Sequence, residues 1–308
     1  MKKHFSIYIL FLGLIFAACE DTIFPTLRDV PAVLVVDAWV TNKPEAQVIK
    51  LTRSQPYFDQ TRPVGVNGAT IKVIDDQGQE YNFEANEEPG HYYWIPADDN
   101  DSFGEVGRSY SLQIELDGDI YESESDMGRV PEIDSIGYFF EEGALGIPDS
   151  WIAEFWARDF QGAGDTYWAR GWKNGVPFLR PAEIITAYDA GFGRGGNVDG
   201  LIFIAPIRRG FNALDQDEDD AFLPSYEPGD SLYVELHSIT EDAFDFLGQV
   251  ATQTNRPGGF GELFAQPLAN VPTNIRVNGE VDNKLVVGFF NVAAVTANGR
   301  RLRVEDYE

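Results

Sequence analysis

The N-terminal segment contains the only cysteine of the chain. It indicates in which compartment the rest of the chain folds and whether disulfides can stabilise it. Two lysines precede an apolar run over residues 7–16, and Ala17, Ala18 and Cys19 follow it. A basic start, an apolar core and small residues in this order are typical of a secretory signal. We therefore expect the chain from Cys19 onward to be exported and to fold without internal disulfides, so that side-chain packing supplies its stability.

Small residues directly before a cysteine resemble the lipobox of bacterial lipoproteins. The resemblance implies that residues 1–18 are a cleaved signal peptide and that the Cys19 thiol is acylated with fatty acids such as palmitate. Phe16 departs from the Leu that is usual three places before the cysteine. A transmembrane helix would need about 20 apolar residues, more than this run offers. A plain secretory signal would leave Cys19 as an unpaired thiol in an exported protein, which would need an explanation. Lipidation of Cys19 provides one.

Residues 19–31 are expected to form a lipidated tether, because they are polar and interrupted by Pro25 and Pro31. The acids Glu20 and Asp21 directly follow the cysteine and resemble the export signals of surface lipoproteins in the Bacteroidetes. We therefore expect an outer-membrane lipoprotein that lies on the cell-surface face rather than on the periplasmic face.

The sequence is strongly acidic, with 50 acidic residues against 23 lysines and arginines and a formal net charge of -27. Nucleic acids and anionic membrane surfaces would repel such a body, so we expect it to bind neither. Hydrophobic residues make up 44% and aromatic residues 13% of the chain, which is enough to fill a core. The chain is therefore not expected to be a disordered tail.

Seven short segments with alternating or β-branched apolar residues occupy the first part of the mature chain. Such segments predict strands, and Asp117-Gly118 predicts a hairpin between the last two. Seven strands with frequent turns over roughly 100 residues favour an immunoglobulin-like β-sandwich at residues 32–128. The predicted strands are 32–40, 47–53, 69–75, 80–84, 91–95, 109–116 and 120–123.

Residues 129–308 are predicted to form a larger β-rich domain, entered through a linker at 130–136. One helix is expected near 240–252, because Thr240 can cap it, acids occupy its first turn and apolar residues recur on one face. The predicted strands of this domain are 151–159, 166–172, 200–207, 230–239 and 285–296. The fold class expected for the whole chain is therefore mostly β.

Several segments together resemble the Bacteroidetes lipoprotein family called domain of unknown function 4249. They are Cys19 and residues 34–41, 49–58, 66–73, 130–136, 237–247, 272–275 and 287–290. The resemblance spans nearly the whole mature chain. It implies an outer-membrane lipoprotein that is commonly encoded beside a TonB-dependent receptor. It implies no catalytic residues, because none are established for the family.

The sequence offers little to support an enzyme. Residues 191–196 match G-x-G-x-x-G, but a dinucleotide site needs a helix that opens on the glycines, and an apolar strand is predicted there instead. His91 and His237 lie in predicted strands, where structural roles are expected. The G-x-S-x-G and H-E-x-x-H motifs are missing. We expect no catalytic residues, and an unrecognised hydrolase is an alternative.

No cofactor is expected, with calcium as the one alternative. Five of the six residues at 215–220 are acidic. Carboxylates at alternate positions can converge on calcium, which makes Asp215, Asp217 and Asp219 a candidate metal site. Their spacing does not fit an EF-hand loop, and a solvated acidic loop is the competing interpretation.

Aromatic residues crowd the region 151–172. Aromatic faces can stack on sugars and anchor protein interfaces, but large apolar side chains chiefly fill cores, and we expect most of these residues in the core. Tyr57 and Phe58 lie in a proline-containing loop and are the candidate contact surface for a partner. The crowded residues are Trp151, Trp156, Tyr167, Trp168 and Trp172.

Together these features predict a non-enzymatic outer-membrane lipoprotein that acts as an accessory or binding partner of a TonB-dependent receptor in nutrient uptake. A stand-alone surface lipoprotein that binds glycan or peptide is the first alternative, and a hydrolase is the second.

Overall fold

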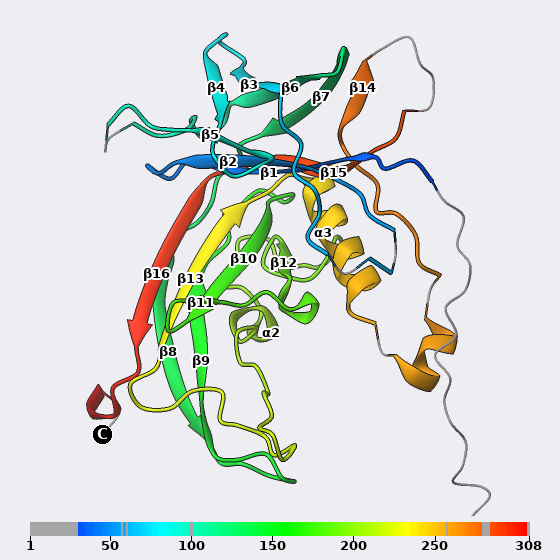
Figure 1. Ribbon diagram of the computed structural model, residues 1–308. Coiled ribbons are helices and arrows are strands. Elements are labelled where there is room, and N and C mark those ends of the chain that lie inside the picture. Colours follow the sequence, from blue (N-terminus) through cyan, green and yellow to red (C-terminus); the bar gives the residue numbers. More distant parts are fainter. Residues whose placement is uncertain are drawn as a thin grey trace, which may run out of the picture. The chain divides into compact units, whose positions relative to one another are not determined.

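The larger sheet of the protein has nine strands in the order β14-β7-β6-β3-β4-β5-β2-β1-β15 (Figure 1). The computed structural model describes residues 30–306, except residues 57, 60, 99–100, 257, 266 and 279–283. The strands of this sheet are β1 (Leu34–Thr41), β2 (Gln47–Arg53), β3 (Thr70–Asp75), β4 (Glu80–Ala85), β5 (His91–Trp94), β6 (Ser109–Leu116), β7 (Asp119–Asp126), β14 (Arg276–Asn278) and β15 (Val286–Ala293).

This sheet curls over itself and encloses one apolar core. Alternation along β1 and β6 sends every second side chain inward, among them Val36 and Ile114, which are fully buried. The backbone N–H of Val292 in β15 donates to Ser125 Oγ in β7 at 2.9 Å, so strands from the two ends of the sheet meet. The curled sheet thus forms two layers that face each other across the core. This arrangement confirms the predicted mostly β fold with an immunoglobulin-like sandwich at its N-terminal end.

Strand β15 joins the first sheet although it lies more than 150 residues beyond the last strand of the predicted sandwich. It runs parallel to β1, with Val36 opposite Gly288 in register. Its outer edge is covered by the Asn274 side chain, which accepts from Phe290 N at 3.1 Å and donates to Phe290 O at 2.8 Å. Strand pairing therefore does not follow the predicted division at residue 129, and residues 32–308 form one compact unit.

The second group of strands surrounds a separate core that includes Phe155, Tyr167 and Leu236. A five-stranded sheet packs with a two-stranded hairpin and a short helix around this core. The elements are β8 (Ile133–Glu141) and β9 (Ser150–Ala157) in the hairpin, β10 (Thr166–Lys173), β11 (Val176–Pro177), β12 (Ile185–Tyr188), β13 (Ser231–Ser238) and β16 (Val295–Arg301) in the sheet, and the short helix α2 (Ala205–Arg208). Elsewhere in the chain are the helical segments η1 (Pro181–Glu183), η2 (Gly259–Phe264) and η3 (Val304–Asp306).

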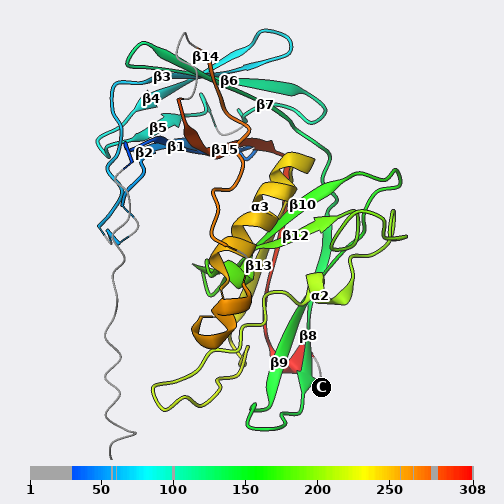
Figure 2. The same cartoon turned by 90° about the vertical axis from the view of Figure 1, so that its right-hand side faces the viewer.

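The predicted helix is confirmed as α3, Glu241–Thr254. The Thr240 side chain caps it by accepting from Ala243 N at 3.2 Å, and two acids occupy its first turn. The helix lies beside β10, β12 and β15 (Figures 1 and 2). Phe246 from α3 packs against Phe289 from β15 with ring centroids 4.6 Å apart. None of the helices in the described residues is long and apolar enough to span a membrane.

Three local predictions in this region are wrong. The predicted linker at 130–136 already contains the start of β8, where Ile133 and Ile136 are buried in the second core. The predicted strand at 200–207 does not form: Ile202 makes an isolated bridge to Arg158, and the helix α2 begins at Ala205. Pro206 lies in the first turn of α2, where proline is favoured and its missing N–H costs nothing.

The predicted strand at 285–296 is two strands. Ala294 separates β15 from β16, and it exchanges two hydrogen bonds of 2.9 Å with Ser238. The chain changes sheets at this residue, so one continuous apolar segment serves both sheets.

Candidate functional site

The face of β10 and β13 that points away from the second core concentrates aromatic and charged side chains. Side chains alternate between the two faces of a strand, so Tyr167 and Ala169 enter the core while Trp168, Arg170 and Trp172 point outward. The register pairs these three residues with His237, Glu235 and Tyr233 of β13, respectively. We call these six residues the aromatic face.

Arg170 lies between the two tryptophans of the aromatic face. Its guanidinium carbon is 4.8 Å from the ring centroid of Trp168 and 5.4 Å from that of Trp172. Within the described residues, the Arg170 guanidinium forms no hydrogen bond or ion pair; its ladder pairing with Glu235 is through the backbone. Burial lowers the pKa of Arg170, while the charges of Glu235 and Asp37 act in the opposite direction. The stacked guanidinium is thus held in place with its N–H donors available.

Glu235 and His237 form the buried, charged floor of this face. Lys43 Nζ donates to Glu235 Oε1 at 2.8 Å, and His237 Nε2 lies 2.9 Å from Glu235 Oε2. Burial opposes ionisation, but the bonds from His237 and Lys43 outweigh it and lower the pKa of Glu235 to about 2. Burial also lowers the pKa of His237, so we assign a neutral ring that donates from Nε2. This histidine is a structural donor rather than a general base.

The first sheet adds further groups beside the aromatic face. Trp39 of β1 meets Trp168 edge to face, with ring centroids 5.2 Å apart. Asp37 of β1 is exposed, lies opposite Lys50 of β2 in register and interacts electrostatically with Arg170. Within the described residues, the side chains of Asp37 and Lys50 form no hydrogen bond or ion pair, although their backbones belong to the sheet. Planar rings beside unpaired donors and acceptors can bind a ligand that has one apolar face and several polar groups.

A second cluster of polar groups is built from aspartates. Asp159, Asp189 and Asp199 each direct a carboxylate oxygen to within 4.8 Å of the others, and they are the one such group of three among the described residues. Tyr167 donates its hydroxyl to Asp159 Oδ1 at 2.6 Å, and Gly164 N donates to Asp189 Oδ1 at 2.7 Å. Burial raises the pKa of Asp159. These three carboxylates have the ligand type that a calcium ion prefers.

The acidic loop that the sequence singles out is arranged differently. Asp215 pairs with Arg180 at 2.6 Å. One oxygen of Asp217 accepts from the backbone N–H groups of Asp219 and Ala221, both at 2.9 Å. The structure therefore does not bring the carboxylates of Asp215, Asp217 and Asp219 together as a group of three, because two of them are used within the loop or by an arginine.

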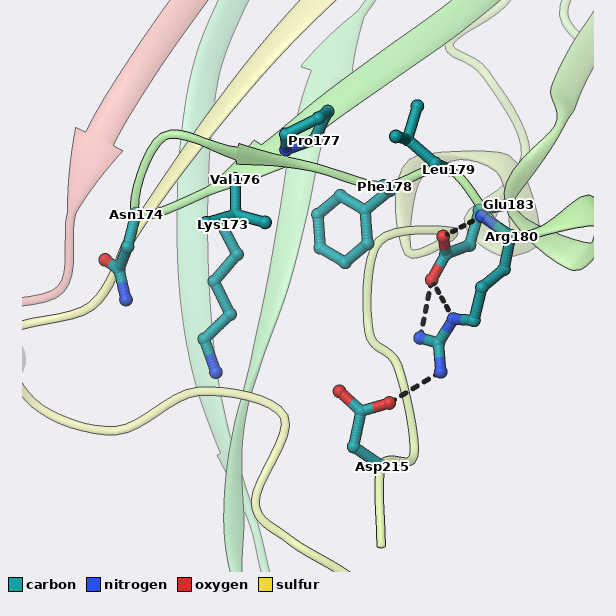
Figure 3. A pocket seen from close by; sticks show the side chains of 9 residues that line it. All are labelled: Lys173, Asn174, Val176, Pro177, Phe178, Leu179, Arg180, Glu183 and Asp215. Carbon is teal, nitrogen blue, oxygen red and sulfur yellow. Dashed lines mark hydrogen bonds and ion pairs between the residues drawn. The ribbon is translucent and has the colours of Figure 1, made fainter. Parts of the chain in front are cut away.

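A pocket of about 550 Å³ lies at the β10–β11 hairpin (Figure 3). Val176, Phe178 and Leu179 supply its apolar wall. Its charged rim is already paired, because Arg180 binds Glu183 and Asp215, each at 2.6 Å. The pocket therefore offers apolar surface but no unpaired catalytic group.

The other candidate residues of the sequence have varied outcomes. Cys19 and Tyr57 lie outside the described residues. Phe58 is 43% exposed, and His91 contacts the Pro89 carbonyl through a ring nitrogen at 3.3 Å. The glycine segment 191–196 is a loop, tied to α3 by Arg194, which binds Asp245 at 2.9 and 3.1 Å.

The expectation that most of the aromatic residues at 151–172 serve the core holds for Tyr167, Trp151 and Trp168 and fails for Trp156 and Trp172. Tyr167 is fully buried. The four tryptophans are partly buried. Among them, Trp151 packs against the second core, and Trp168 packs against a smaller core that includes Leu247 and Phe289. Trp168 and Trp172 differ from Tyr167 because even-numbered positions of β10 face away from the core. The two-residue spacing of Trp168, Arg170 and Trp172 is the signal that could have revealed the aromatic face.

Residues 20–298 match the family described as a domain of unknown function, DUF4249, and the chain belongs to this family. No curated protein matches the sequence. Among solved structures, the chain is similar to the N-terminal four Ig domains of Dscam1 isoform 7.44. That match has 15% identity and a TM-score of 0.17, covers 68% of this chain and spans 48% of the other, and carries no argument about function.

Proposed function

We propose that this protein is a non-enzymatic lipoprotein, anchored to the outer membrane through Cys19, that binds a ligand on the aromatic face and serves as the accessory partner of a TonB-dependent receptor. The single observation that carries the binding role is Arg170, whose guanidinium is stacked between two tryptophans and forms no hydrogen bond or ion pair among the described residues. A rigid, stacked arginine with free donors costs little entropy to engage a ligand.

The membrane anchor and the receptor partnership rest on different support. The basic start, the apolar run and the small residues before Cys19 support lipidation. Two acyl chains would hold the protein firmly at a membrane, because a single chain binds only marginally. The receptor partnership rests on the family resemblance, in which such lipoproteins are encoded beside these receptors.

A stand-alone glycan- or peptide-binding lipoprotein is the second candidate function, and the aromatic face favours it as well. Tryptophan rings offer stacking surfaces to sugar rings and to apolar side chains. Arg170, Lys50 and Asp37 supply donors and acceptors for hydroxyl or amide groups. The two candidates differ in whether the protein works with an integral membrane partner.

The binding role predicts that substitutions on the aromatic face lower the affinity for ligand and leave the stability of the fold nearly unchanged. We expect Arg170→Met to keep the free energy of unfolding within about 1 kcal/mol, because the side chain packs between rings and forms no ion pair. The same variant, and Trp172→Ala, should lose at least tenfold in affinity for whichever soluble oligosaccharide or short peptide the wild type binds. A panel of such probes, read by calorimetry, checks this. Trp151→Ala, which removes a partly buried tryptophan elsewhere, is the matched control.

Two outcomes would contradict the binding role. Wild-type protein that binds no member of the panel would leave the aromatic face without a ligand of the proposed kind. Equal affinities for wild type and Arg170→Met would show that the ligand binds elsewhere.

The anchor has its own test. Metabolic labelling with palmitate should label the wild type and leave the Cys19→Ala variant unlabelled. Labelling of that variant would contradict acylation at Cys19.

A further inference from the structure

The tip of the β8–β9 hairpin presents apolar side chains to solvent. Residues 142–149 connect the two strands, and in both views this connection lies at the end of the unit opposite the nine-stranded sheet (Figures 1 and 2). Leu145 is fully exposed, and Phe140 and Ile147 are 54% and 39% exposed. Exposed apolar residues that cluster, rather than occur singly, mark interaction sites.

Leu145 also occupies a backbone position that is unfavourable for leucine. Ile147 N donates to Ala144 O at 3.0 Å, and the two central residues of this turn, Leu145 and Gly146, have φ angles of +54° and +88°. These angles define a type I′ turn, whose first central position favours asparagine, aspartate or glycine. Leucine there is strained and buries nothing within the protein. Folding stability therefore does not explain its presence.

The hairpin tip is well supported from within the protein. Gly143 N donates to Asp149 Oδ1 at 2.8 Å and closes the base of the loop. The rings of Phe140 and Trp151 meet edge to face with centroids 5.5 Å apart. Further along β9, the buried carboxylate of Glu154 is held by Arg208 Nε at 2.6 Å and by Arg209 Nε at 3.1 Å. Because the tip is already ordered, a partner would gain contact area without the cost of ordering a loop.

The geometry points to this tip as a docking element that inserts Leu145 into an apolar pocket, bordered by basic side chains, on an integral outer-membrane protein. The charge pattern favours the basic border, and the proposed receptor partnership supplies the integral membrane protein. Glu142 and Asp149 are exposed around the tip and would meet a basic border favourably. Glu141 is also exposed but already pairs with Arg209 at 2.9 Å. The same acids, on a chain of formal net charge -27, oppose insertion into an anionic lipid surface. The inference rests on the proposed receptor partnership and assigns the residues that contact the partner.

The test compares three forms of the full-length, acylated protein in mild-detergent extracts of native outer membrane. We expect Leu145→Asn to recover at least tenfold less of the integral partner than the wild type, with an unchanged or raised unfolding midpoint, because asparagine tolerates the left-handed turn. Leu179→Asn is the matched control. Leu179 is 76% exposed and is not among the residues with positive φ, so its loss should leave partner recovery unchanged.

A photo-reactive residue in place of Ile147 gives a second readout in intact membranes. It should crosslink to the same integral protein that the wild type recovers, whereas the same residue in place of Leu179 should not. Crosslinking of position 147 to lipid would overturn the inference and make the tip a membrane-contacting element.

The outcomes separate this inference from the proposed function. Equal recovery of the partner by wild type and Leu145→Asn would contradict the docking role alone. A wild type that recovers no partner would contradict the receptor partnership and, with it, the docking role. A large fall in the unfolding midpoint of Leu145→Asn would show that Leu145 is a structural residue.

Discussion

Replacing Gly288 by alanine is expected to destabilise the protein by about 4 kcal/mol or more, one of the largest effects available to a single added methyl group. Gly288 lies in β15 opposite Val36 of β1, with φ at +105°, and a Cβ there would stand 1.9 Å from Val36 O. Both obstacles are backbone atoms or backbone angles, so no side-chain rotation relieves them. Chemical denaturation of the two forms measures the difference.

Gly118→Ala is the matched control for Gly288→Ala. Gly118 also has a positive φ, +85°, but an added Cβ would meet nothing within 4 Å. Only the backbone conformation is then penalised, at about 1 to 2 kcal/mol. Equal losses in the two variants would contradict the close approach of β15 to β1 and would place the parallel pairing of the C-terminal strand in doubt.

The second large effect is expected at Lys43, which neutralises the buried carboxylate of Glu235. Lys43→Met leaves Glu235, only 4% exposed, with His237 as its main partner. We expect a loss of about 2 kcal/mol at neutral pH, less than for a fully buried pair because Lys43 itself is partly exposed. Lys72→Met is the control, since Lys72 is as exposed as Lys43 but pairs with the more exposed Glu80. It should change stability by less than about 0.5 kcal/mol.

The same pair predicts how stability depends on pH. The pKa of Glu235 falls from 4.5 to about 2 on folding, so its contribution is fully present above pH 4.5 and is lost as the pH falls through about 2. Burial lowers the pKa of His237 below 6.5, which adds a loss of stability as the pH falls below that value.

In Lys43→Met the Glu235 carboxylate loses a stabilising charge, so the decline in stability between pH 4.5 and 2 should be shallower than in the wild type. Denaturation curves over this range provide the check. A wild type whose stability is flat from pH 6.5 to 3 would contradict the arrangement of Lys43, Glu235 and His237.

Local sequence patterns predicted most of the elements of the fold. Apolar and polar residues alternate in 47–53 and 109–116 because one face of each strand is buried, and this pattern is visible within the segment itself. Both segments form strands with the predicted bounds. Thr240 and the acids after it marked the start of α3 for a similarly local reason.

Features that depend on distant partners could not be predicted in this way. The parallel pairing of β15 with β1 joins segments about 250 residues apart, and nothing near Val36 indicates it. The start of β8 at Ile133 looks like a linker until the second core is known to bury it.

The aromatic face depends partly on a local sequence pattern and partly on distant packing. The spacing of Trp168, Arg170 and Trp172 is visible in the sequence, but its meaning depends on which face of β10 the core covers. That choice is made by Tyr167 and Ala169 packing into the second core. The aspartate group of Asp159, Asp189 and Asp199 was beyond sequence reasoning, because the β9–β10 connection and the longer β12–α2 connection bring its carboxylates together.

The most direct test of the proposed function is a mild-detergent pull-down of the tagged, full-length lipoprotein from native outer membrane, with Cys19→Ala as the control. We predict that a TonB-dependent receptor co-purifies in stoichiometric amount with the acylated form and in much smaller amount with the Cys19→Ala form. An acylated lipoprotein that is recovered alone would contradict the accessory role and would leave ligand binding by the protein on its own as the function to pursue.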